Sequence, residues 1–193
     1  MATPLLLICI AATASSREGR FPEPAEPLDA AGRRDAALAR LPQRYHAALQ
    51  ASPARAAAET ASAMGLTART EPALADIDHG EWQGLSFAQI EASDPGQLGR
   101  WLAEPAQGAP AGETLEQVRT RVGAWMDRVA GADAPTCAIT HPMTIRAALS
   151  HALDLPLRAA LAIDVAPLSC TVLSFNRSWR LQSLGLAVRG VPG

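Results

Sequence analysis

Two side chains that can exchange protons near neutral pH fall at positions where an α/β protein places its chemistry. His141 follows directly after the apolar run Thr136–Thr140, and Asp76 lies in a predicted loop that also carries His79. An imidazole beside a carboxylate can act as a general acid or base. The same residue types also bind metals, but their spacing here matches no metal-binding signature. We therefore take His141 and Asp76 as the candidate catalytic pair and expect no metal; a purely structural role for His141 is the alternative.

The elements that must position these residues alternate between short apolar runs and longer helical patterns. Leu5–Cys9 is a continuous apolar run, which is typical of a central parallel strand. The clearest helix follows Thr114, because Thr114 and Gln117 form a capping-box pair before apolar residues that recur every three or four positions. The predicted elements are, in order, strand 5–9, helix 30–41 after the N-cap Asp29, strand 47–51, helix 53–64, helix 115–129, strand 136–140, a helix with Ile145, Leu149 and Leu153 on one face, and a hairpin of strands 169–175 and 179–184.

This alternation predicts an α/β fold, a three-layer sandwich with a mostly parallel sheet and helices on both faces. The ligand site of such a sheet lies at the carboxyl ends of its strands. The 193 residues suit one domain, which we place at 1–186. The segment near 93–112, rich in Pro, Gly and Ala, predicts an irregular cap, and 187–193 a flexible tail.

Charge and composition narrow the class of partner. The formal net charge is −2, and no run approaches the roughly 20 apolar residues of a membrane span. We therefore expect no nucleic acid and no membrane partner, but an unidentified small molecule, with a neutral one favoured. All 17 basic residues are Arg, which with the Ala-rich segments indicates a bacterial-type composition.

Three cysteines in apolar runs favour a cytoplasmic protein with reduced thiols. A secretory signal at the apolar N-terminus is the minor alternative, since no positive residues precede it. We expect a monomer or homodimer and no cofactor.

Four motifs stand in a fixed order along the chain. They are Cys9-Ile10-Ala11-Ala12-Thr13, then Ser52-Pro53 with Thr60-Ala61, then Leu74-Ala75-Asp76 with Gly80, Trp82 and Gly84, then Thr140-His141-Pro142. Over Leu5 to Leu184 this set resembles the histidine phosphatase superfamily, the phosphoglycerate-mutase-like proteins. Members of that family carry Arg-His-Gly-x-Thr, Ser-Pro-x-x-Arg-Ala, Leu-x-Glu-x-x-x-Gly-x-Trp-x-Gly and His-Gly at these places.

The resemblance implies phosphoryl transfer through a phosphohistidine, with two arginines and a second histidine holding the phosphoryl oxygens and a carboxylic acid protonating the leaving group. In this chain Ile10 takes the place of the nucleophile and has no lone pair, and Cys9 takes the place of the first Arg. Ala56 stands where the second Arg is counted, although Arg55 is adjacent and a one-residue shift would bring it in. Pro142 removes the N–H that a Gly would offer.

The resemblance also assigns several neighbours to the pocket. Thr13, Ser16 and His79 lie near it by pattern, and Ser16 stands where members often carry an Asn. Arg17, in the loop after the first strand, is expected at the mouth of the site, with a solvated surface position as the alternative.

Three hypotheses follow. The chain is a pseudo-phosphatase, degenerate at its nucleophile motif, with a ligand-binding or structural role; or it is a repurposed or weakly active enzyme that uses His141 and Asp76; or its pocket is collapsed around Ile10. A nucleophilic Cys9 is disfavoured because no phosphate-loop spacing joins it to Arg17 and an apolar strand raises the pKa of a thiol.

Overall fold

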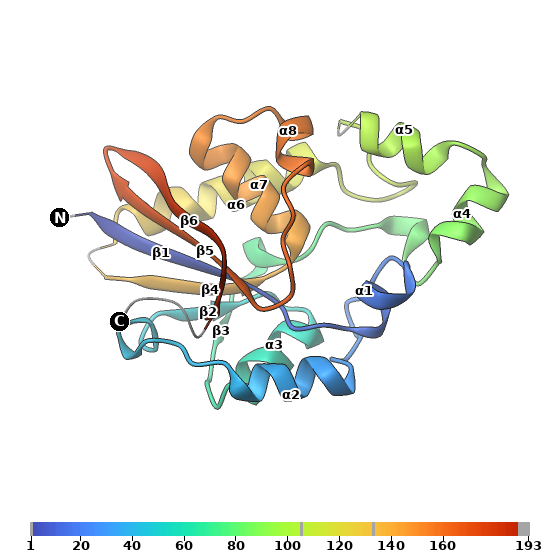
Figure 1. Cartoon of the computed structure of the whole chain (residues 1–193). Helices are drawn as coiled ribbons and strands as arrows, with labels where there is room; N and C mark the ends of the chain where they lie inside the picture. The colour runs from blue at the N-terminus through green and yellow to red at the C-terminus, as the bar shows by residue number, and fades with distance from the viewer. Residues whose placement is uncertain (1, 105, 133, 189–193) are drawn as a thin grey trace.

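The computed structural model describes residues 2–104, 106–132 and 134–188. Its strands form one six-stranded sheet in the order β3-β2-β4-β1-β5-β6 (Figure 1). The first four strands in this order are parallel, and β5 pairs with β1 and β6 in antiparallel fashion. The strands are β1 (Thr3–Cys9), β2 (Leu49–Ala51), β3 (Arg69–Thr70), β4 (Thr136–Thr140), β5 (Ser169–Asn176) and β6 (Ser178–Ala187).

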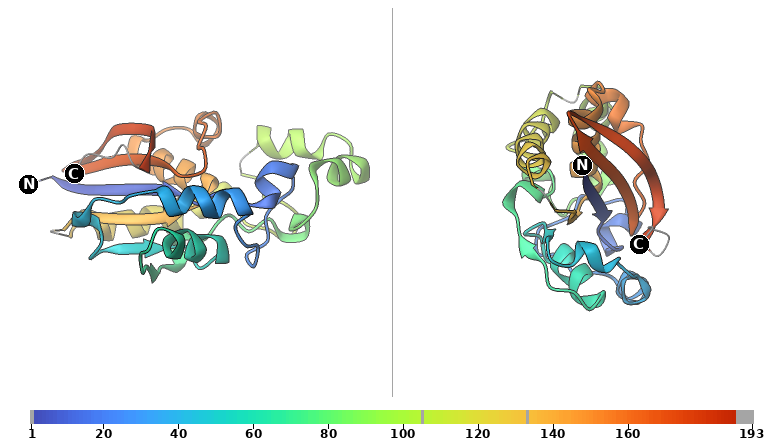
Figure 2. Two further views of the ribbon diagram at one scale, coloured as in Figure 1. Left: turned by 60° about the horizontal axis from the view of Figure 1, so that its bottom comes forward. Right: turned by 90° about the vertical axis from the view of Figure 1, so that its left-hand side faces the viewer.

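Helices cover both faces of this sheet. The helices are α1 (Ala14–Glu18), α2 (Ala30–Leu38), α3 (Arg55–Ala63), α4 (Phe87–Ser93), α5 (Gln97–Ala103), α6 (Leu115–Ala130), α7 (Pro142–Leu153) and α8 (Leu157–Leu161). Figure 2 shows α6 and α7 on one face, α2 and α3 on the other, and α4 with α5 beyond one end of the strands. The predicted three-layer α/β sandwich with a mostly parallel sheet is confirmed.

Strand β1 lies between β4 and β5 in the sheet, and both of its faces are buried. Leu5, Leu7 and Cys9 pack in the cluster that includes α6 and α7, whereas Leu6 and Ile8 pack in the cluster that includes α3. This is the two-residue alternation of a strand, with apolar side chains needed on both sides. It explains why the sequence shows an unbroken apolar run here.

Some predicted boundaries were wrong. Helix α2 ends at Leu38 rather than at residue 41, since Ala39 is extended and Pro42 disfavours helical backbone in the residue before it. Strand β2 begins at Leu49, because residues 46–48 form a turn.

The segment 93–112 is not wholly irregular, because it contains α5. Helix α4, which precedes it, was missed although Ser86 and Gln89 form a capping box. The predicted flexible tail does not begin at Ala187, which is the last residue of β6, and Val188 is 2% exposed. The rest of that tail, residues 189–193, lies outside the described residues. Within the described ranges, no helix is both long and apolar enough to cross a bilayer.

Candidate active site

The site forms where three neighbouring parallel strands end. Ser52 follows β2, His141 follows β4 and Ile10 follows β1. The backbone N–H of Ile10 donates to the Thr140 carbonyl at 2.8 Å, and that of Ser52 donates to the Ile139 carbonyl at 2.9 Å. The sheet register therefore brings these three residues to one edge, as expected for the carboxyl ends of parallel strands.

His141 is held between a hydroxyl and a carboxylate. It is the N-cap residue of α7 and 4% exposed. Its Nε2 lies 2.8 Å from Ser52 Oγ, and its Nδ1 lies 3.5 Å from Asp76 Oδ2. A carboxylate can only accept, so it favours the proton on Nδ1, which leaves Nε2 to accept from the Ser52 hydroxyl. Burial lowers the pKa of His141, against the opposing pull of Asp76, so the ring is neutral at pH 7.

On one side of this pair lies a cavity of about 410 Å³, which we call the cap cavity. Helices α4 and α5 contribute Phe87, Leu98, Trp101 and Leu102 to its wall. The full set of lining residues is Ile10, Ala11, Thr13, Ser15, Ser16, Arg20, Phe21, Pro22, Asp76, His79, Phe87, Leu98, Trp101, Leu102, His141, Pro142, Met143, Arg146 and Leu161. Most of these are apolar or aromatic, and the cavity is open rather than collapsed around Ile10.

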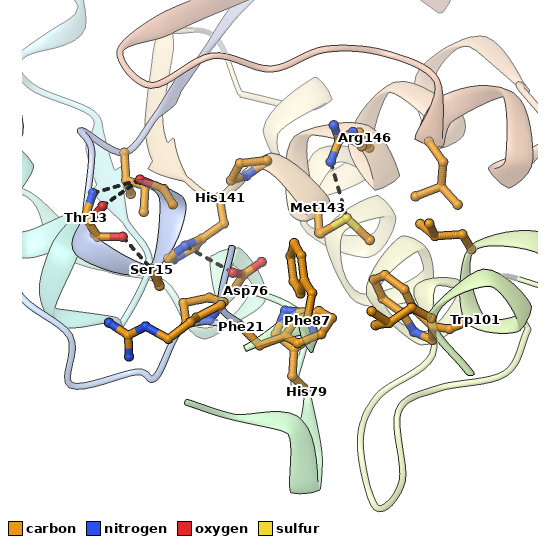
Figure 3. A pocket seen from close by; sticks show the side chains of 18 of the residues that line it. Thr13, Ser15, Phe21, Asp76, His79, Phe87, Trp101, His141, Met143 and Arg146 are labelled. Atoms are coloured by element: carbon orange, nitrogen blue, oxygen red, sulfur yellow. Dashed lines mark hydrogen bonds and ion pairs between the residues drawn. The ribbon is translucent and has the colours of Figure 1, made fainter. Parts of the chain in front are cut away.

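Aromatic rings line the cap side of this cavity (Figure 3). The Phe21 ring centroid lies 4.4 Å from that of His79 and 5.6 Å from that of Trp101. His79 is 4% exposed, and its Nδ1 has no hydrogen-bond partner among the described residues. Burial lowers the pKa of His79, although Asp76 and Asp78 oppose this shift. His79 is therefore a neutral ring in an aromatic wall.

Seven of the predicted site residues line the cap cavity. They are Ile10, Thr13, Ser16, Asp76, His79, His141 and Pro142. The Ser16 hydroxyl donates to the Thr13 carbonyl at 2.7 Å, so it is used within the turn that begins α1 and is not free to donate to a ligand.

Three predicted pocket residues lie elsewhere. Cys9 packs in the core against the helix layer because of its register in β1, and burial raises the pKa of its thiol. Arg55 points away from the cavity: its side chain is 57% exposed and its Nε donates to Glu59 at 2.8 Å. The one-residue shift that would have brought it in does not occur, and Ala56 is the buried residue of the two. Arg17 is 55% exposed and pairs with Asp29.

Sequence reasoning missed Arg146, which lines the cap cavity. Its Nε donates to the Ile163 carbonyl at 2.8 Å, and its guanidinium lies 3.5 Å from the Met143 sulfur. Among the described residues, no carboxylate lies within ion-pair distance of it. The signal was its position four residues after Pro142, which places the two on one face of α7.

The arrangement offers an acid/base pair. Among the residues that the structure describes, no group of three or more His, Cys, Asp or Glu side chains is placed to hold a metal ion.

Comparison with known proteins places these observations in a family. A model of the histidine phosphatase superfamily (branch 1) matches residues 5–186. An acid phosphatase of Mycobacterium tuberculosis is 30% identical over 147 residues, which are 74% of this chain and 67% of that protein. A bifunctional protein of the same organism is 33% identical over 114 residues, 56% of this chain but 31% of its own length, so the chain spans about a third of that relative.

Solved structures agree with this placement. A mycobacterial hydrolase has a TM-score of 0.87 at 25% identity, over 97% of this chain and 100% of its own. A mycobacterial glucosyl-3-phosphoglycerate phosphatase complexed with VO3 has a TM-score of 0.86 at 25% identity, over 96% of this chain and 100% of its own. With its strand-end His141 and the family match over nearly its full length, the chain belongs to the histidine phosphatase superfamily.

Proposed function

We propose that this chain has lost phosphohistidine-based phosphoryl transfer and that its cap cavity binds a largely apolar small molecule of low charge. The observation that carries the proposal is Ile10, which lines the cavity in the place where the family resemblance puts the nucleophilic histidine. A branched alkyl side chain has no lone pair with which to attack phosphorus. Loss of a nucleophile that works as part of a unit costs on the order of a million-fold in rate.

The positive charges that would hold a phosphate are also reduced. Cys9 stands in place of the first Arg and carries no positive charge, and Arg55 does not line the cavity. Arg20 does line it, but its guanidinium pairs with Glu18 at 2.9 Å. Arg146 alone lines the wall without a carboxylate partner among the described residues. Each charge-assisted hydrogen bond that is not made forgoes about 1.5–3 kcal/mol.

The size and lining of the cavity indicate the class of ligand. Its volume of about 410 Å³ is within the range of small-molecule sites. Phe21, Phe87 and Trp101 offer aromatic faces, which favour an apolar or aromatic group over a phosphate ester.

A pair of assays tests the proposal. The unmodified chain and an Ile10→His, Cys9→Arg, Ala11→Gly variant are compared for release of phosphate from an aryl phosphate. We expect no turnover by the unmodified chain, since Ile10 cannot attack phosphorus. We expect turnover by the variant, since an acid phosphatase and a glucosyl-3-phosphoglycerate phosphatase are among the proteins that the chain resembles. The single Ile10→His variant controls for the cost of burying Arg at position 9. Turnover by the unmodified chain that disappears in His141→Ala refutes the proposal.

The contact between His141 and Asp76 favours a second candidate, a repurposed or weakly active enzyme that uses this pair as acid and base. Their separation of 3.5 Å is close enough for the carboxylate to orient the ring. Hydrolysis or isomerisation of a neutral substrate that is lost in both His141→Ala and Asp76→Asn supports this candidate; activity that survives both changes excludes it.

We also propose that the protein is cytoplasmic and is a monomer or homodimer. The cytoplasmic location is supported by Cys9, Cys137 and Cys170, which are all free and buried. Sedimentation of the purified chain measures the oligomeric state.

A further inference from the structure

A second cavity lies on the other side of the His141–Asp76 pair. It has a volume of about 290 Å³, and we call it the strand-end cavity. Its lining residues are Pro22, Glu23, Pro24, Ser52, Pro53, Ala54, Ala75, Asp76, Ile77, Asp78, Gln83 and His141. Ser52 lines this cavity and not the cap cavity, whereas His141 and Asp76 border both.

Three of these residues form a chain from hydroxyl to carboxylate. Ser52 Oγ lies 2.8 Å from His141 Nε2, and His141 Nδ1 lies 3.5 Å from Asp76 Oδ2. The Ala54 N–H donates to Ser52 Oγ at 3.2 Å, so the hydroxyl proton is left for Nε2. The hydroxyl–imidazole distance is within the range expected of a nucleophile and its base, and the longer contact to the carboxylate is of the kind that tightens when a substrate binds.

We propose that Ser52, His141 and Asp76 form a serine-nucleophile relay that hydrolyses small, uncharged or positively charged carboxylic esters in the strand-end cavity. Ser52 and His141 are the catalytic residues, and Asp76 positions His141. The same three roles recur on unrelated folds and are recognised by geometry rather than by chain order.

The reaction balances with an ester and water alone. Ser52 Oγ forms a bond to the ester carbonyl carbon while His141 Nε2 takes the hydroxyl proton. The ester C–O bond then breaks, and the leaving alcohol carries that proton away. A water molecule attacks the acyl-serine, its proton passes through Nε2 to Ser52 Oγ, and the carboxylic acid is released.

The charge around the strand-end cavity sets the substrate class. Glu23, Asp76 and Asp78 line it; Glu23 and Asp78 are exposed, and Asp76 is half-buried. Among the described residues that line it, none is an arginine. An anionic ester would meet three carboxylates without a counter-charge, whereas a neutral or cationic ester would not.

The relay shares His141 and Asp76 with the acid/base candidate above, but adds a nucleophile and a separate cavity. It does not depend on what the cap cavity binds or on whether phosphoryl transfer is lost. Hydrolysis that persists in Ser52→Ala but disappears in His141→Ala overturns the relay and leaves the acid/base candidate standing.

The first measurement uses the unmodified chain, so that folding of a variant is not in question. The protein is incubated with diisopropyl fluorophosphate, and the modified residue is located by peptide mass spectrometry. We expect one adduct, on Ser52, whose formation slows in His141→Ala. No adduct, or an adduct on another serine, overturns the proposal.

The second measurement is hydrolysis of p-nitrophenyl esters of acetate, betaine and succinate, which are neutral, cationic and anionic. We expect turnover of the first two in preference to the third. Ser52→Ala should bring hydrolysis down to the level of the buffer blank, since loss of a nucleophile that works as part of a unit costs on the order of a million-fold. Ser62→Ala is the matched control, because Ser62 is exposed on the next helix. For Asp76→Asn, a positioning role predicts that the pH dependence of kcat shifts, and an unchanged profile removes Asp76 from the relay.

Discussion

Arg121 of α6 fixes the loop that carries Asp76, and removing it is the sharpest stability test of the site. Its guanidinium makes two parallel bonds to the Glu113 carboxylate, both 2.8 Å long. It also donates to the carbonyls of Ala73, Ala75 and Asp76 at 2.8, 3.0 and 2.9 Å. One side chain therefore joins the segment 73–76, which ends at Asp76, to Glu113.

Arg121→Ala removes all five of these hydrogen bonds; afterwards the Ala75 carbonyl still accepts from the Thr144 hydroxyl and the Glu113 carboxylate from the Asp78 N–H. The side chains of Arg121 and Glu113 are 23% and 20% exposed, so water replaces only part of what is lost. Breaking a buried pair by removing one partner costs about 3–5 kcal/mol. We take the lower end, about 3 kcal/mol, because of that partial exposure; for a chain of this size it lowers Tm by roughly 6–12 °C.

The assay is urea unfolding followed by tryptophan fluorescence. Arg119→Ala is the matched control on the same helix: Arg119 contacts Glu116 at 3.9 Å and the 98% exposed Asp154 at 3.4 Å. Such surface pairs contribute about 0.5 kcal/mol or less. A loss in Arg121→Ala no larger than that in Arg119→Ala refutes the reasoning, as does a double variant with Glu113→Gln whose loss equals the sum of the two single losses.

Two further predictions concern the packing of Gly32 against the loop after β1 and the titration of two buried histidines. Gly32→Ala places a methyl group 2.2 Å from the Ala12 carbonyl oxygen and should lower the unfolding free energy by about 2–3 kcal/mol. Gly99→Ala, whose added methyl group meets no neighbouring atom within 4 Å, should raise it by about 0.5–1 kcal/mol. Similar effects at both glycines contradict this prediction. Burial lowers the pKa of His79 and of His141, so the unfolded chain binds more protons than the folded chain below about pH 6.5. The unfolding free energy therefore decreases as the pH is lowered through this range. Urea titrations at pH 7.5 and 5.5 should show a smaller fall for the His79→Phe, His141→Gln variant, and an equal fall rules out these two groups as its source.

The elements that build the site were predictable because their sequence patterns are local. Strand β4 has the predicted bounds Thr136–Thr140, since a buried parallel strand requires an uninterrupted apolar run. The capping box at Thr114 and Gln117 marks the start of α6 as predicted. From two such strand ends, the position of His141 beside Ile10 follows without knowledge of any side-chain contact.

Side-chain direction at the helix starts was not predictable in the same way. Arg55 and Ala56 are adjacent in sequence, and about 100° around a helix axis decides which of them faces the cavity. The helix α3 begins at Arg55, and the carboxylate of Glu59 one turn later draws the guanidinium to the solvent side. Only the tertiary placement of α3 against β4 settles that choice.

The boundary between the two cavities was also beyond the sequence. Ser52 was visible as part of the Ser52-Pro53 motif, but its motif gives no reason to pair its hydroxyl with a histidine 89 positions away. That pairing depends on β2 and β4 being neighbours in register, with Leu49 opposite Cys137. Because β1, the strand after which Ile10 stands, lies on the other side of β4, His141 has the hydroxyl of Ser52 on one side and an alkyl group on the other. Among the described residues, the hydrogen bond from a hydroxyl to His141 comes from the β2 side, and for this reason the proposed nucleophile lies in the strand-end cavity.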